Sequence, residues 1–207
     1  MARSEHHPNG LIYYNPQLSY RGYTLFSADA SALLMDMEGR FVHRWRPADG
    51  CFNPELLPGG NLMAMGRPAD DIVGQRGLNG LASCVYELDW DGNTVWRFDD
   101  PWLHHDYQRL PNGNTLLIKW APMPRSVVRR IKGGYHDDED DPREMLGDVI
   151  LEVNGSGEVV DEWKSWEHLD PKSEIICPLE HRKEWSHCNS VSLAPNGDWL
   201  LSFRRIN

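Results

Sequence analysis

The sequence lacks the long apolar runs of membrane proteins, and it lacks an apolar segment near its first residue. No window approaches the roughly 18 apolar residues that a membrane-spanning helix needs. The first ten residues, Met-Ala-Arg-Ser-Glu-His-His-Pro-Asn-Gly, contain no apolar stretch of the kind found in secretory signals. We therefore expect no membrane association. On the sequence as given we expect a cytoplasmic protein, or a periplasmic one if a signal was removed.

Positive charge is also scarce. The chain has 21 Lys and Arg against 31 Asp and Glu, for a net charge of −10. Such a chain repels phosphate backbones, so we expect no nucleic-acid partner. The four cysteines include no C-x-x-C pair, and we expect free buried thiols in preference to disulfides. By contrast, 40% hydrophobic residues and nine Trp indicate a packed globular protein.

A helical period of about 3.6 is absent as well, and a repeat of short strands takes its place. Apolar runs rich in Val, Leu and Ile alternate with two kinds of turn, D/N-x-x-G and P-x-G. Gly supplies the positive φ that tight hairpin turns require. The pattern occurs three times, with its turn glycines at Gly39 and Gly60, at Gly92 and Gly113, and at Gly157 and Gly197.

Each repeat predicts four short strands, and four-stranded units recurring along a chain are typical of β-propeller blades. The sequence therefore predicts an all-β fold. An N-terminal arm (1–21) is expected to precede a partial β-propeller (22–207), with repeats at about 22–66, 81–120 and 147–207. A stack of β-hairpins in an open sandwich is the alternative.

Three blades are too few to close a propeller, which usually has about four to eight. We therefore expect either that the chain is part of a longer polypeptide or that two copies close the ring as a homodimer. Two insertions interrupt the repeat. Residues 121–147 are rich in Pro, Gly and charge and predict a surface loop, and residues 164–186 predict a lid or wall over a site.

Titratable side chains stand just before the P-x-G turn of the second and third repeats. The second repeat has His104, His105 and Asp106, and the third has His187 and Asn189. Equivalent positions of successive blades lie at similar radius and height. We therefore expect these side chains to face a shared space, with Asp106 and Asn189 orienting the histidines or binding substrate.

Two arginines, Arg204 and Arg205, follow the third P-x-G turn. Because successive strand residues point to opposite sides, one of them can point toward the histidines. A guanidinium beside imidazoles suits an oxyanion such as sulfate, phosphate or carboxylate. Arg204 is therefore a candidate catalytic residue and Arg205 a candidate substrate-binding residue.

Two elements of the sequence resemble the arylsulfotransferase family. They are His-His-Asp followed by Leu-Pro-Asn-Gly-Asn (104–114), and Trp-Ser-His-Cys-Asn-Ser-Val followed by Leu-Leu-Ser-Phe-Arg (185–204). The resemblance extends over roughly residues 22–207. Members of the family are six-bladed propellers that move a sulfuryl group between phenols without a nucleotide donor. The resemblance thus implies no cofactor, with an aryl sulfate and a phenol as small-molecule partners.

Carried over by this resemblance, His187 and Arg204 look like the pair that binds the sulfuryl oxygens. One of His104 and His105 looks like a further sulfate-contacting histidine, and the motifs leave open which one. The family's nucleophilic histidine lies on a later blade, which would fall beyond Asn207.

Two other functions are compatible with the same residues. The first is a binding or assembly module that keeps the fold and an anion pocket without turnover. The second is a metal-dependent hydrolase or lyase with His104, His105, Asp106 and His187 as ligands, a set that suits zinc or iron. The resemblance favours an arylsulfotransferase without a metal.

Overall fold

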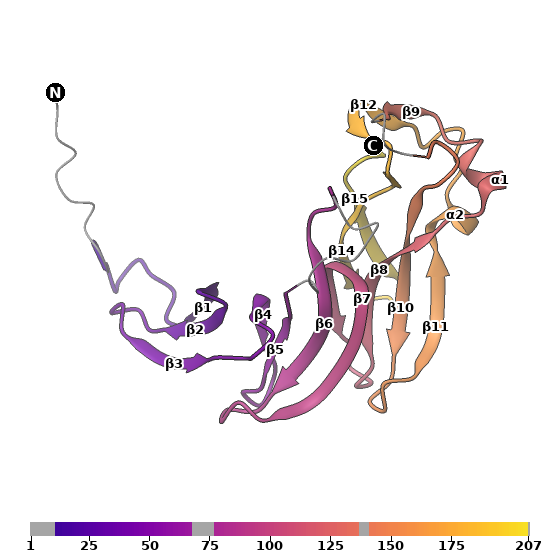
Figure 1. Ribbon diagram of the computed structural model, residues 1–207. Helices are drawn as coiled ribbons and strands as arrows, with labels where there is room; N and C mark the ends of the chain where they lie inside the picture. Colours follow the sequence, from indigo (N-terminus) through magenta and orange to yellow (C-terminus); the bar gives the residue numbers. More distant parts are fainter. Residues whose placement is uncertain (1–10, 68–76, 137–140, 207) are drawn as a thin grey trace, which may run out of the picture. The chain divides into compact units, whose positions relative to one another are not determined.

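The computed structural model describes residues 11–67, 77–136 and 141–206 (Figure 1). These residues group into two compact units. The first unit comprises residues 11–67 and 86–95, and the second comprises residues 77–85 and 96–206. Residues 1–10 of the predicted N-terminal arm lie outside the described part, and residues 11–21 form no helix or strand.

Strands make up most of the regular structure of both units. The first unit contains β1 (Thr24–Ala28), β2 (Ser31–Met35), β3 (Phe41–Trp45), β4 (Phe52–Leu56) and β5 (Leu62–Met65). Two strands, β6 (Leu81–Leu88) and β7 (Thr94–Arg109), contribute residues to both units. The second unit adds β8 (Thr115–Pro122), β9 (Gly133–Tyr135), β10 (Leu146–Val153), β11 (Val159–Lys164), β12 (Ile176–His181), β13 (Glu184–Trp185), β14 (Cys188–Leu193) and β15 (Trp199–Phe203).

The fold is all-β, as predicted, and its main sheets are antiparallel. The helices in the described residues, α1 (Arg125–Val128) and α2 (Ser165–His168), are one turn each. Within the part of the chain that the structure describes, no helix combines the length and apolar character needed to cross a membrane.

Six hairpin turns follow one hydrogen-bonding pattern. In each turn the glycine N–H donates to the carbonyl three residues earlier, as Gly92 does to Asp89 at 3.1 Å and Gly113 does to Leu110 at 3.0 Å. Each of these glycines has a positive φ, which a side chain would strain. The turn glycines are those named from the sequence: Gly39, Gly60, Gly92, Gly113, Gly157 and Gly197.

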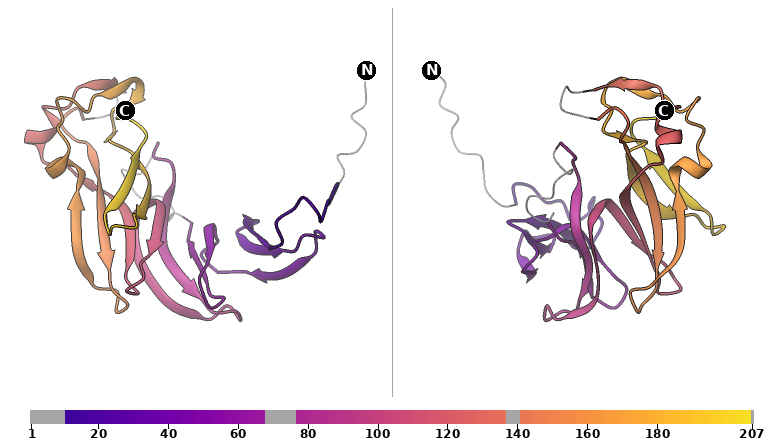
Figure 2. Two further views of the ribbon diagram at one scale, coloured as in Figure 1. Left: turned by 180° about the vertical axis from the view of Figure 1, so that it is seen from behind. Right: turned by 45° about the vertical axis from the view of Figure 1, so that its right-hand side comes forward.

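In the second unit, β7, β8, β10 and β11 follow one another in chain order across an antiparallel sheet (Figure 2). This is the strand order of a propeller blade. Its four strands come from two sequence repeats, since β7 and β8 flank the second P-x-G turn while β10 and β11 flank the third N-x-x-G turn. The structural unit is therefore shifted by one hairpin from the predicted repeat boundaries.

The β14–β15 hairpin packs against this sheet in both views of Figure 2. The contact is a buried apolar cluster that includes Ile118 of β8, Ile150 of β10 and Val191 of β14. Side chains of β7 also bond the hairpin backbone, because Asp106 Oδ2 accepts the Val191 N–H at 3.1 Å. The hairpin thus sets the third repeat's pre-turn strand beside that of the second repeat.

The two insertions share a core of their own. Met123, Val128 and Ile131 from the first insertion are buried with Ile176 and Trp185 from the second. Strand β9 pairs with β12 in parallel, which joins the two insertions by backbone hydrogen bonds as well. The described part of the first insertion is therefore not a simple surface loop, because several of its apolar side chains are buried in this cluster.

Candidate functional site

The backbone leaves regular strand geometry at the positions of the predicted histidines. His105 has φ 58°, His187 has φ 53° and its neighbour Ser186 has φ 78°. The β7–β8 register also shifts between Leu103 and Tyr107, around His105. Left-handed backbone at residues other than glycine costs about 1–3 kcal/mol each and concentrates at functional sites, and bulges change the direction of side chains. These distortions point to a site in the second unit.

The distortions bring three histidine rings together around a buried tryptophan. The His104 ring stacks on Trp120 with centroids 3.8 Å apart, and both residues are fully buried. The His105 ring meets the His104 ring edge to face at 5.1 Å. The His187 ring lies 4.7 Å from that of His105. The predicted shared space between the second and third repeats thus contains all three histidines.

A buried carboxylate orients His187. Its Nδ1 lies 2.7 Å from Glu184 Oε1, and both side chains are almost entirely buried. Since a carboxylate only accepts hydrogen bonds, Nδ1 carries the proton and Nε2 of the neutral ring does not. Arg205 Nη2 forms an ion pair with the same Glu184 oxygen at 3.3 Å. The arginine therefore holds the carboxylate, and the carboxylate holds the ring.

A second carboxylate stands behind the other two histidines. His104 Nε2 lies 3.3 Å from Asp148 Oδ1, and the Ser186 hydroxyl donates to Asp148 Oδ2. The Nδ1 atoms of His104 and His105 are 2.9 Å apart, so one of them donates and the other accepts. The Asp148 charge favours a proton on Nε2 of neutral His104. That makes His104 Nδ1 the acceptor and leaves His105 Nε2 as the unprotonated nitrogen.

The surroundings of His105 keep its ring neutral. Burial is the main cause that lowers its pKa, from 6.5 to about 4, and the charges of His104 and His187 lower it further, whereas Asp148 opposes the shift. Gly80 packs directly on the ring, because a Cβ at Gly80 would lie 2.5 Å from His105 Cε1. The Gly80 carbonyl also accepts the His105 N–H at 2.8 Å.

The lowered pKa of His105 predicts an acid sensitivity of the fold. Between pH 6.5 and about 4 the unfolded chain binds a proton at this residue and the folded chain does not, so the free energy of unfolding falls as the pH falls through that window. From pH 7 to pH 5 we expect the wild type to lose roughly 1 kcal/mol more than His105→Gln, after allowance for the ring's partial exposure. Urea unfolding at both pH values measures the difference, and equal losses would contradict the shift.

One known family resembles this chain over nearly its whole length. The model of the family described as arylsulfotransferase (ASST) matches residues 21–207. The chain belongs to the arylsulfotransferase family.

The other comparisons add little about the family or the function of the chain. No curated protein matches this arylsulfotransferase family member significantly. Among solved structures, it is similar to a protein of unknown function from Bacteroides caccae, with 14% identity and a TM-score of 0.43 over 88% of this chain and 65% of that chain. The chain thus spans 65% of the length of that protein.

The other predicted residues of this family member differ in their burial and contacts. Arg204 is about half exposed, and its Nη2 lies 2.5 Å from Glu180 Oε1. Arg205 is buried and contacts both Glu180 and Glu184. Asp106 accepts a backbone N–H from β14, and Asn189 is exposed. Of the two arginines, Arg205 is therefore the one linked to a site histidine.

Sequence reasoning missed the residues that orient the rings: Glu184, Asp148, Trp120 and Gly80. Glu184 carried a usable signal, since it stands three residues before His187. The others come from strands and loops far away in the chain, so no local pattern marks them. In the described residues, the His, Cys, Asp and Glu side chains form no group of three or more with the geometry of a metal site. The metal-dependent alternative therefore gains no support from the arrangement.

Proposed function

We propose that this chain forms the sulfuryl-binding and proton-transfer part of an arylsulfotransferase. The reaction moves a sulfuryl group from an aryl sulfate to a phenol and uses no nucleotide donor. The family assignment supports the reaction class. The observation that carries the proposal is the pair of rings of His105 and His187, 4.7 Å apart. Glu184 contacts His187 directly, whereas Asp148 contacts His104, whose Nδ1 lies 2.9 Å from His105 Nδ1.

His187 is the acid–base residue in this proposal. Its unprotonated Nε2 accepts the proton of the phenol as the phenol oxygen attacks sulfur, and Glu184 stabilises the resulting imidazolium. The bond between sulfur and the donor's aryl oxygen breaks, and the imidazolium gives its proton to the leaving phenolate. Until that transfer, the imidazolium N–H donates to a sulfuryl oxygen. The histidine thus serves both proton transfer and oxyanion binding.

His105 stays neutral, which is why the two rings can remain close after His187 becomes charged. A second imidazolium at this distance would repel the first. The transition state of sulfuryl transfer, like that of loose phosphoryl transfer, spreads charge over the peripheral oxygens, so positioned cations lower the barrier. Arg204 is the proposed cation. By resemblance, the nucleophilic histidine belongs to a later blade, so we assign no covalent intermediate to these residues.

The test is an assay of 4-nitrophenyl sulfate with phenol as the acceptor, on the wild type and on His187→Ala. We expect the variant to lose roughly 10²–10⁴-fold in rate, the range that acid–base residues supply. His168→Ala is the matched control, because His168 stacks on Trp163 at 4.9 Å and belongs to none of the contacts described above. Equal rates for the wild type and His187→Ala would overturn the assignment.

Light scattering on the same samples gives the mass in solution. Turnover by a dimer would support two half-rings that complete one another. Binding of 4-nitrophenyl sulfate without turnover, measured by calorimetry, would favour the binding module that retains an anion pocket. If the chain shows no binding and no turnover, the proposed function is contradicted.

A further inference from the structure

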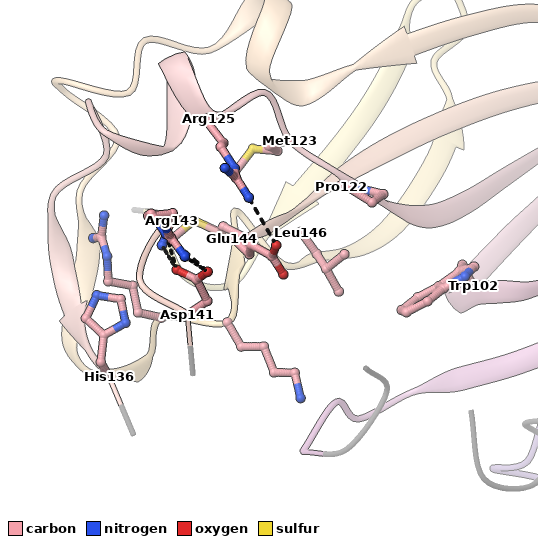
Figure 3. Close-up of a pocket in the computed structure, with 12 residues that line it drawn as sticks. Trp102, Pro122, Met123, Arg125, His136, Asp141, Arg143, Glu144 and Leu146 are labelled. Carbon is pink, nitrogen blue, oxygen red and sulfur yellow. Dashed lines mark hydrogen bonds and ion pairs between the residues drawn. The ribbon is translucent and has the colours of Figure 1, made fainter. Parts of the chain in front are cut away.

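The second unit contains a cavity of about 640 Å³, the size of a small-molecule site. Figure 3 shows Trp102 at one end of this cavity and Arg143 and His136 at the other. Leu146 and Pro122 lie between them. The cavity therefore combines an aromatic wall, an apolar floor and cationic side chains.

Strand register places the cavity next to the histidine site. Leu146 of β10 pairs with Pro122 of β8, and two residues further along Asp148 pairs with Trp120. Residues two apart on a strand share a face. The cavity residues Leu146 and Pro122 are therefore the next neighbours, on the same face, of two residues that contact His104. A substrate held at the histidines would extend into this cavity.

Among the described residues, one arginine of the cavity differs from the others in its partners. Arg143 pairs with Asp141 at 2.7 Å, and Arg125 pairs with Glu144 at 3.5 Å. Arg182 differs, because its guanidinium is half-buried and donates to main-chain carbonyls, at 2.7 Å to Gly133 and 2.6 Å to Ile131. No carboxylate of the described residues pairs with Arg182.

A half-buried guanidinium that pairs with no carboxylate of the described residues favours an anionic ligand, because carbonyl oxygens satisfy its N–H groups but not its charge. Trp102, which is partly buried, stands two residues before His104 on β7 and offers an aromatic face. An aromatic ring against Trp102 would direct a substituent on its far side toward the cationic end of the cavity.

We propose that this cavity selects aryl substrates that carry a carboxylate, with the ring against Trp102 and the carboxylate at Arg182. The inference rests on the proposed function, since the phenol or sulfate end of the same molecule would lie at the histidines. The preferred acceptors are hydroxyaryl carboxylic acids, and neutral phenols are poorer ligands.

The experiment compares two ligands by calorimetry on the full chain. 4-Hydroxyphenylacetate and 4-hydroxyphenylacetamide have nearly the same shape and differ in charge. We expect the wild type to bind the acid at least about 10-fold more tightly, which corresponds to about 1.4 kcal/mol. Equal affinities, or no measurable binding of either ligand, would overturn the proposal.

Variants show which residue causes the preference for the acid, and they separate this preference from turnover. Arg182→Gln should abolish the preference for the acid, and Arg182→Lys should retain part of it. Arg129→Gln, at an exposed arginine outside the cavity lining, is the matched control and should leave it unchanged. His187→Ala should stop sulfuryl transfer yet keep the preference, so a failed assay and a failed cavity assignment give different results. A preference that survives in Arg182→Gln would overturn the assignment.

Discussion

Replacing Glu184 by glutamine is expected to lower kcat for sulfuryl transfer by roughly 10³-fold with little change in KM. Glu184 Oε1 contacts both His187 Nδ1 and Arg205 Nη2. In the variant the amide oxygen can take the place of Oε1 and accept from both groups, so the hydrogen bond to the ring is kept. The amide lacks the negative charge that stabilises the imidazolium formed when His187 takes the proton of a phenol, so that proton transfer becomes less favourable.

Glu180→Gln is the matched control for this variant. Among the described residues Glu180 pairs with Arg204 and Arg205 and not with His187, so this variant is a control for the hydrogen bonding of the ring and for stability. It is not a control for kcat, because it also removes the partner of Arg204. Nitrogen NMR of the imidazole shows directly whether Nδ1 carries the proton, and we expect it to do so in both variants. Removing one partner of a buried pair also costs up to about 3–5 kcal/mol, which urea unfolding would measure. Loss of the Nδ1 proton in Glu184→Gln would contradict the charge effect, because a rearranged hydrogen bond would then explain the lost activity.

Much of the fold follows from local chemistry that the sequence displays. The six hairpin turns could be predicted because a glycine at a fixed position is the residue that tolerates the required φ. Which hairpins pair into one sheet could not be predicted in the same way. A repeat has a period but an arbitrary starting point, so β7–β8 can pair with the hairpin before or after it. The structure has β10 beside β8, joining halves of two repeats.

The candidate site, like the fold, could be predicted from the sequence only in part. Matched positions in successive repeats correctly suggested that His105 and His187 share a space, since the symmetry of a repeat relates them. The partners that give each ring its protonation state do not obey that symmetry. Asp148 lies on β10 and Glu184 in the second insertion, so only the folded chain brings them to the histidines. Positive φ at His105 and His187 is likewise set by tertiary contacts and not by residue type.

Replacing Asp148 by asparagine tests the other half of the site and is expected to lower kcat by roughly 10²–10³-fold. The asparagine amide would donate to His104 Nε2, which makes His104 Nδ1 a donor and His105 Nδ1 an acceptor. The proton of His105 then moves to the nitrogen that the proposal leaves unprotonated. Because asparagine has nearly the same size as aspartate, the buried packing around Ser186 is retained.

A purely structural effect of Asp148→Asn can be separated from this electrostatic one by titrating His105. The negative charge of Asp148 raises the pKa of His105 against the larger opposing effect of burial. Its removal should therefore lower that pKa below about 4, whereas local unfolding would expose the ring and raise the pKa toward 6.5. Asp161→Asn, an exposed position on β11, is the control and should change neither kcat nor the titration. The direction of the shift decides between a site carboxylate and a packing residue, because the two mechanisms move the same pKa in opposite senses.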